Sequence, residues 1–240
     1  MEYTIVLSDE LLKAYYYFKN SQPVKQDTIV NLFKYYISGH LTNYKQLKNI
    51  GIEDDSLEQQ LVQDGYINQT LEELCEKTIY KFILNTERDD YPYININSDK
   101  IERNFTATYG RNENRNKTID HIKALCKNAK FIVIYDKYMK DAVVKGIAKI
   151  LPRKKLKIIY KNGQLSDTQI TILKNICKVW TKGCIKSKGW TMQEDTNHTY
   201  DNYHDRYLLI DNQIEVILTS GFDYLFDENK DFTYIVRNKS

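Results

Sequence analysis

Apolar residues recur three and four positions apart through most of the first half of the chain. This spacing places them on one face of a helix. It predicts four helices, over residues 11–19, 27–38, 57–64 and 70–85. Polar side chains that can cap a first helical turn stand near the starts of three of them, at Ser8, Asp27 and Asn68. The first half is therefore expected to be mainly helical.

The pattern changes between residues 91 and 109, where apolar and polar residues alternate. A period of two is typical of a half-buried strand, so we expect strands at 93–97 and 105–109. The polar segment 110–115 follows and is rich in turn residues. It predicts a boundary between a mainly helical domain, residues 1–115, and a second domain, residues 116–240.

Helix-like and strand-like segments alternate after residue 116. Expected helices cover residues 117–128, 137–150 and 166–177, and each leads into an apolar run, at 131–135, 156–160 and 184–188. Parallel strands need long crossover connections, so this alternation predicts an α/β domain whose largely parallel sheet is flanked by helices. Three more short strands, at 207–210, 215–218 and 232–236, are separated only by turns. The sheet is therefore expected to end as a mixed sheet.

Five tyrosines fall in or beside the first two expected helices: Tyr15, Tyr16, Tyr17, Tyr35 and Tyr36. Aromatic residues at helical spacing most often belong to a core or its edge. Exposed rings could instead stack on the bases of a nucleic acid. The sequence leaves both interpretations open.

The composition is that of an ordinary globular protein, with 240 residues of which 42% are hydrophobic and 28% charged. Apolar runs are far shorter than the roughly 20 residues that cross a bilayer, and the first residues lack the order of a signal peptide. We therefore expect a cytoplasmic protein without a membrane span. Four scattered cysteines show no metal-ligand or disulfide spacing, so neither a metal nor another cofactor is predicted.

Charge is shared unevenly between the two halves. Residues 1–115 contain 13 Lys and Arg against 18 Asp and Glu, whereas residues 116–240 contain 22 against 14. Basic side chains gather around the expected strand at 156–160, with Lys155 and Lys157 among them. They could follow a phosphate backbone or form a solvated surface. A polyanion is expected to bind the second half.

One histidine stands among residues suited to phosphate chemistry. His204 follows a long polar loop, with Asp205 and Arg206 beside it and Asp211 further along an expected strand. Side chains two positions apart on a strand share a face, so His204 and Arg206 are expected to lie together. The Arg fork can hold two phosphate oxygens, and a neutral imidazole can attack phosphorus or move a proton. The alternative is a structural ion pair between Asp205 and Arg206.

The spacing His204-x-Arg206-x4-Asp211 resembles the H-x-K-x4-D motif of the phospholipase D superfamily, with Arg in place of Lys. Residues 218–223 stand where that superfamily carries a Gly-Ser-x-Asn segment. The sequences of both segments are most similar to those of the phospholipase D-like domain at the carboxyl terminus of MIT-domain proteins and its bacterial relatives, which have H-D-R and then G-L-D-x-F. Residues 134–138 also resemble their Asp-Pro-Tyr segment. The resemblance covers residues 117–238 and leaves the first half unmatched.

This resemblance implies a metal-independent phosphodiesterase that works through a phosphohistidine, with an endonuclease acting on DNA or RNA as the main expectation. Such enzymes need two facing motifs and this chain has one, so a homodimer that shares its site is implied. A bacterial defence or toxin effector is the expected setting, with the helical domain as a regulatory unit or a site for a regulatory partner. The expected catalytic residues are His204, Arg206 and Asp211, and the expected substrate-binding residues are Asp205, Thr219, Ser220, Asp223, Lys155 and Lys157.

A second function follows from the same resemblance. The domain of MIT-domain proteins that has the same H-D-R motif is regarded as a binding module without catalytic activity. The alternative prediction is therefore a non-catalytic module that binds nucleic acid or anionic phospholipid through Arg206. Cleavage of nucleic acid in the presence of a metal chelator would separate the two functions.

Overall fold

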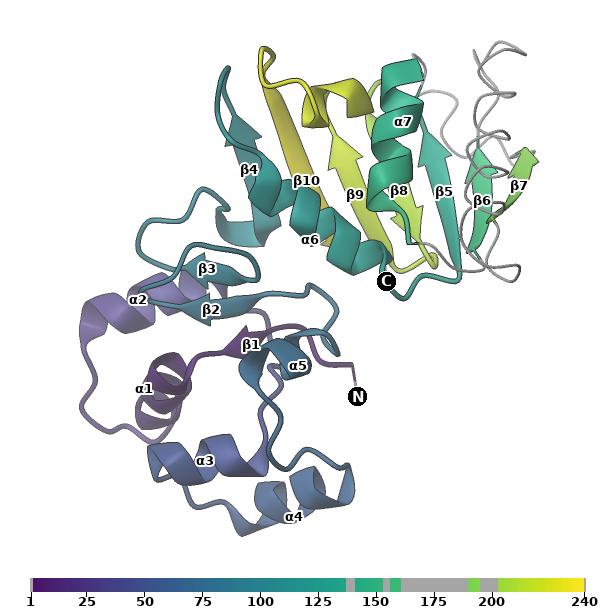
Figure 1. Cartoon of the computed structure of the whole chain (residues 1–240). Helices are drawn as coiled ribbons and strands as arrows, with labels where there is room; N and C mark the ends of the chain where they lie inside the picture. The colour runs from purple at the N-terminus through teal and green to yellow at the C-terminus, as the bar shows by residue number, and fades with distance from the viewer. Residues whose placement is uncertain (1, 137–140, 153–155, 161–189, 195–202, 240) are drawn as a thin grey trace. The chain divides into compact units, whose positions relative to one another are not determined.

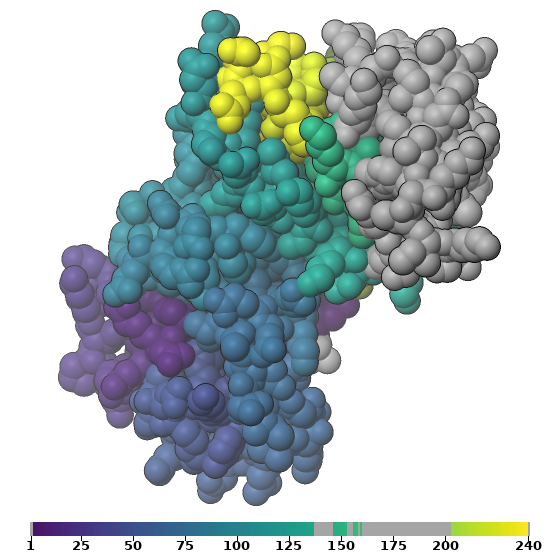
Figure 2. Space-filling model, viewed as in Figure 1, coloured from purple at the N-terminus to yellow at the C-terminus, as the bar shows by residue number. Residues whose placement is uncertain are grey.

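The computed structural model describes residues 2–136, 141–152, 156–160, 190–194 and 203–239 (Figures 1 and 2). Contacts divide the chain into two units, Met1–Arg103 and Asn104–Ser240. The division falls earlier than the boundary expected at residue 115. The reason is that strand β4 (Thr106–Tyr109) pairs with β10 (Phe232–Asn238), the last strand of the second unit.

In its described residues the first unit combines helices with a small parallel sheet. The helices are α1 (Asp9–Lys19), α2 (Gln26–Tyr35), α3 (Tyr44–Ile50), α4 (Asp55–Gln63) and α5 (Leu71–Cys75). Three expected helices are thus confirmed as α1, α2 and α4, whereas α3 was not expected. Ser8 caps α1 as predicted, but Asp27 lies inside α2, and Thr70 rather than Asn68 caps α5.

The helix expected over residues 70–85 is wrong beyond Cys75. Residues Ile83–Asn85 instead form strand β2, which lies between β1 (Val6–Leu7) and β3 (Tyr93–Asn95) and is parallel to both. All three residues of β2 are buried. A short apolar run has the same signature in a buried strand as in a buried helix, so the periodicity could not distinguish them.

An aromatic cluster joins α1 and α2 to the segment that follows them. The ring of Tyr15 stacks on that of Tyr36, with centroids 5.2 Å apart, and the Tyr36 hydroxyl is hydrogen-bonded to Nδ1 of His40 at 2.9 Å. Burial, with a smaller effect from Lys19, lowers the pKa of His40 to about 4. Tyr16 and Tyr35 are buried, which confirms the core interpretation for these two tyrosines.

A seven-stranded sheet forms the centre of the second unit, with the strand order β4-β10-β9-β8-β5-β6-β7. The strands not yet located are β5 (Phe131–Tyr135), β6 (Leu156–Tyr160), β7 (Trp190–Glu194), β8 (Arg206–Ile210) and β9 (Ile214–Leu218). Short 3-10 turns occur at η1 (Arg103–Phe105) and η2 (Phe222–Leu225). The expected mixed α/β class is confirmed.

The expectation that this sheet is largely parallel is wrong. Within the described residues only β5, β6 and β7 run parallel, while the pairings from β4 through β10, β9 and β8 to β5 are antiparallel. The physical reason is the connection between β8 and β9. It is a tight turn with Asp211 and Asn212 at positive φ, and a turn this short can join only antiparallel strands.

Helices α6 (Asn116–Cys126) and α7 (Asp141–Ile150) lie on the same face of the sheet (Figure 1). The buried His121 of α6 is hydrogen-bonded to the Tyr234 hydroxyl of β10 at 3.2 Å. Gly146 of α7 packs against Phe226, where a Cβ atom would come within 2.2 Å of the ring. The expected helix at 166–177 and strand at 184–188 lie outside the described residues.

Arg115 is the largest fully buried side chain among the described residues, with 1% exposure. It precedes α6, and its guanidinium lies 4.8 Å from the centre of the Phe232 ring. It donates hydrogen bonds to four backbone carbonyl oxygens, those of Gly110, Tyr224, Asp227 and Lys230. Arg115 thereby joins the loop between β4 and α6 to the turn before β10, and these two segments lie side by side at the surface in Figure 2.

None of the helices in the described part of the chain has the length and apolar character needed to cross a membrane.

We expect Arg115→Met to lower the free energy of unfolding of the second unit by at least about 3 kcal/mol, because four backbone carbonyls lose the buried guanidinium that donates to them. Urea denaturation followed by circular dichroism measures the change. The control is Arg111→Met, because Arg111 is 75% exposed and its ion pair with Asp231 spans 3.6 Å. Its loss should cost less than about 1 kcal/mol. Equal effects of the two substitutions would contradict the role of Arg115.

His40 should make the stability of the first unit depend on pH. Its folded pKa is lowered to about 4, so the folded state holds the neutral ring. The stabilisation is complete above the unfolded pKa of about 6.5 and declines as the pH falls from there toward 4. Urea denaturation at pH 7.5 and pH 5.0 should show a larger loss for the natural chain than for His40→Asn. An identical pH dependence in both proteins would show that His40 does not titrate on unfolding.

Candidate phosphate site

The candidate site lies at the edge of the seven-stranded sheet where β5 and β9 end and β8 begins (Figure 1). Tyr135, the last residue of β5, pairs with Tyr207, and Arg206 pairs with Leu218, the last residue of β9. This register brings residue 136, residue 206 and the segment from 219 onward to one edge. The expected association of the motif with residues 218–223 is therefore a direct result of strand pairing.

Arg206 is held by a buried carboxylate at this edge. Its Nε lies 3.6 Å from Oδ1 of Asp136, and the Arg206 side chain is 16% exposed. Its Nη1 donates a hydrogen bond to the backbone carbonyl of His204 at 2.9 Å. Arg206 thus forms an ion pair with Asp136.

His204 lies two residues before Arg206, the first residue of β8. It is exposed, and in the described part of the chain its ring forms no hydrogen bond or ion pair. The structure therefore brings His204 and Arg206 to the same sheet edge, with the imidazole accessible from solvent. Nucleophilic attack on a phosphate requires this kind of access.

Four other expected site residues lie at or beside this edge. The Thr219 hydroxyl accepts a hydrogen bond from the Thr233 amide at 3.3 Å, so it also helps to join β9 to β10. Oδ2 of Asp223 lies 3.7 Å from Nζ of Lys230. Asp205 and Ser220 are half-buried. Charged groups of both signs therefore lie at or near this edge of the sheet.

Asp211 lies at the opposite end of β8, away from Arg206. Its Oδ1 accepts hydrogen bonds from the backbone amides of Lys130 and Phe131, each at 2.8 Å, and its own amide donates to the Phe131 carbonyl. Asp211 therefore joins the β8–β9 turn to the start of β5. These contacts give Asp211 a structural role at the end of β8 away from Arg206, and its expected catalytic role stays a prediction.

Of the two lysines expected to bind substrate near β6, the structure describes Lys157. Lys157 is exposed, but it pairs with Phe131, the first residue of β5, and so lies toward the sheet edge opposite to Arg206. Lys155 lies outside the described residues.

Sequence reasoning did not select Asp136 and Lys230 as site residues. Asp136 directly follows a buried strand, which is a recognisable signal, but its contact with Arg206 depends on the antiparallel pairing of β5 with β8. Lys230 follows η2 in a polar turn and lies 4.3 Å from the centre of the Tyr224 ring. Its nearness to Asp223 depends on how that turn folds.

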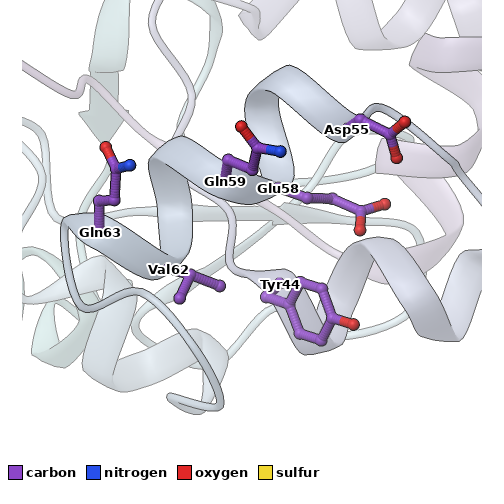
Figure 3. Close-up of a pocket in the computed structure, with 6 residues that line it drawn as sticks. All are labelled: Tyr44, Asp55, Glu58, Gln59, Val62 and Gln63. Carbon is purple, nitrogen blue, oxygen red and sulfur yellow. The ribbon is translucent and has the colours of Figure 1, made fainter.

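A pocket of about 380 Å³ lies elsewhere, in the first unit (Figure 3). It is formed by Tyr44 of α3 and, from α4, by Asp55, Glu58, Gln59, Val62 and Gln63. Glu58 is engaged by Lys48 at 2.8 Å. The pocket contains no residue of the candidate phosphate site.

Within the described residues, no cluster of three or more His, Cys, Asp or Glu side chains could hold a metal ion. Cys75 and Cys126 are buried thiols, and burial raises the pKa of Cys75 to about 12. Cys75 is therefore protonated at neutral pH and unsuited to act as a nucleophile.

No protein-family model and no curated protein matches the chain. Among solved structures, the chain is similar to NucT from Helicobacter pylori, with a TM-score of 0.34 and 12% sequence identity. The match covers 56% of this chain and 86% of NucT. A TM-score of this size decides neither a fold family nor an activity, so the resemblance to phospholipase D-like proteins stays a prediction.

We expect Asp211→Ala to lower the free energy of unfolding by about 2 kcal/mol, because two backbone amides lose their shared acceptor. Asp211→Asn should cost less, since the amide oxygen still accepts and Asn tolerates the positive φ. Urea denaturation measures both changes. A stable Asp211→Ala protein would contradict the structural role given to this residue.

Proposed function

We propose that the second unit is a phosphodiesterase of phospholipase D type that cleaves nucleic acid. The observation that carries this proposal is the accessible imidazole of His204 beside an Arg206 guanidinium that is fixed at a sheet edge. The excess of Lys and Arg over Asp and Glu in residues 116–240, 22 against 14, supports a polyanionic substrate.

The reaction we propose begins with attack of the neutral His204 ring on phosphorus. A P–N bond forms while the bond from phosphorus to the leaving oxygen breaks, and that oxygen receives a proton. Water then attacks phosphorus and gives a proton to the group that protonated the leaving oxygen. The P–N bond breaks, and the phosphomonoester leaves the ring. Arg206 holds non-bridging oxygens throughout, where its positive charge stabilises the negative charge that develops on them.

The proton for the leaving oxygen comes from a second histidine at the same centre. The chain carries one such motif, so we propose that a second copy of the chain supplies its own His204. An isologous dimer with both motifs at its two-fold axis meets this requirement. The proposed setting in bacterial defence, and a regulatory role for the first unit, follow from the resemblance alone.

The Asp136–Arg206 pair favours one other candidate function. Because Asp136 already compensates the charge of Arg206, the site could bind a phosphate group without turning it over. This candidate is a non-catalytic module that binds nucleic acid or an anionic phospholipid. Cleavage assays distinguish it from the enzyme.

We expect the purified chain to cleave labelled DNA or RNA in buffer containing EDTA. His204→Ala should lower the rate at least about 100-fold, because the nucleophile is lost. Arg206→Ala should lower the rate comparably, whereas Arg206→Lys should retain part of it. The control is Lys123→Ala, which removes an exposed cation of α6 that is paired with Asp120. Binding without cleavage in any buffer would contradict the enzyme and support the module.

The same variant tests the shared site. Natural and His204→Ala subunits are mixed in equal amounts and allowed to exchange. If each site needs both subunits, the mixture should show about one quarter of the activity of the same total amount of natural protein. Independent sites would give about one half of that activity. A strict monomer at micromolar concentration, measured by sedimentation, would contradict the dimer.

A further inference from the structure

We propose that Asp136 is the positioning residue of the candidate phosphate site and that it accounts for the Arg at position 206. In this proposal one buried carboxylate orients the Arg206 guanidinium and fixes the backbone of residues 221–222 at the same time. The inference rests on the proposed function, because it concerns the same site.

The Asp136 carboxylate holds two elements that the chain order separates. Its side chain is fully buried, with 0% exposure. Oδ2 accepts a hydrogen bond from the Phe222 amide at 3.0 Å, while Oδ1 lies 3.6 Å from Nε of Arg206. A buried carboxylate is costly unless it is hydrogen-bonded and compensated by a cation. Asp136 therefore favours an arrangement in which β8 and the segment after β9 both face it.

Gly221 leaves room for the Asp223 carboxylate. A Cβ atom at position 221 would lie 2.3 Å from Oδ1 of Asp223, whereas its distance of 3.6 Å from Oδ2 of Asp136 would be an ordinary van der Waals contact. The backbone at Gly221 therefore lies near both carboxylates.

The geometry also explains why an Arg suits this position. A guanidinium spreads five donors over three nitrogens, so Nε can face Asp136 while Nη1 donates to the His204 carbonyl. An ammonium has a single nitrogen. A Lys at position 206 that faced Asp136 would direct its only charged atom into the carboxylate, and Asp136 and Arg206 therefore form a matched pair.

The test uses the full chain with His204→Ala as background, which prevents cleavage. The probes are fluorescein-labelled single-stranded and duplex DNA and RNA, and fluorescence anisotropy gives the affinity. Asp136→Asn keeps an oxygen for the Phe222 amide but removes the charge, whereas Asp136→Ala removes both. We expect Asp136→Asn to weaken binding on the order of tenfold with little change in melting temperature, since Arg206 loses its orientation. Asp136→Ala should also lower the melting temperature.

A double substitution separates positioning from simple structural support. Arg206→Lys alone should bind weakly because Asp136 attracts the ammonium. Adding Asp136→Asn should then restore part of the affinity, although each substitution alone weakens binding. Additive losses would contradict the matched pair, because a purely structural Asp136 gives no such rescue. Asp120→Asn, which neutralises an exposed carboxylate of α6, is the control and should leave affinity unchanged.

A second measurement needs no substrate. The NMR signal of the Arg206 Nε–H group is assigned by its loss in Arg206→Lys. Nε is buried 3.6 Å from Oδ1 of Asp136 without a hydrogen bond to any described residue, so its hydrogen should exchange with water more slowly in the natural chain than in Asp136→Asn, where the ion pair that keeps it buried is lost. If the chain with Asp136 unchanged binds a probe, and Asp136→Asn changes neither the affinity nor the exchange of the Nε hydrogen, the positioning role is overturned while the proposed function stands. If the chain with Asp136 unchanged binds no probe, the proposed function is overturned, and the positioning role is overturned with it.

Discussion

The second unit depends on a buried cation that is stabilised by backbone dipoles. Arg115 donates to carbonyls of the loop after β4 and of the turn before β10, so its guanidinium adds to the direct pairing of these two strands. The turn that Arg115 holds, residues 224–230, begins just after the segment that Asp136 holds through the Phe222 amide. η2 is therefore fixed at one end by a buried anion and at the other by a buried cation. Asp223 and Lys230 owe their positions beside the candidate site to these two anchors.

The spacing of the His-x-Arg-x4-Asp segment corresponds to the length of one strand. β8 has five residues and spans about 16 Å, with Arg206 at its first position and Asp211 immediately after its last. One end of the strand thus contributes to the candidate chemistry, while the other end closes a turn and holds the start of β5. The segment indicates both a site and the strand that supports it. An acidic residue in such a spacing need not lie near the substrate.

The sequence predicted β5, β6, β8, β9 and β10, which coincide with short apolar runs bounded by turn residues, but it assigned the residues of β7 to a polar loop. It also placed His204 and Arg206 at a strand start. Strand direction was harder, since an apolar run carries no information on the direction of its neighbour. Arg115 belonged to a segment assigned to a polar turn, and only tertiary packing shows it as the core of a junction. Asp136 required the register of β5 against β8, which periodicity does not provide.

The charges around Arg206 limit how this site could recognise a phosphate. Arg206 and Lys230 supply two positive charges, while Asp136, Asp205 and Asp223 supply three negative ones. These five described side chains therefore give a phosphodiester no net attraction of their own. Among them, recognition depends on hydrogen bonds aimed at individual oxygens, which depend on orientation far more than a diffuse field does. A second copy of the chain at the same centre would double the number of hydrogen-bond donors aimed at one phosphate without requiring a net positive pocket. A buried Asp136 is therefore compatible with a site that two subunits share.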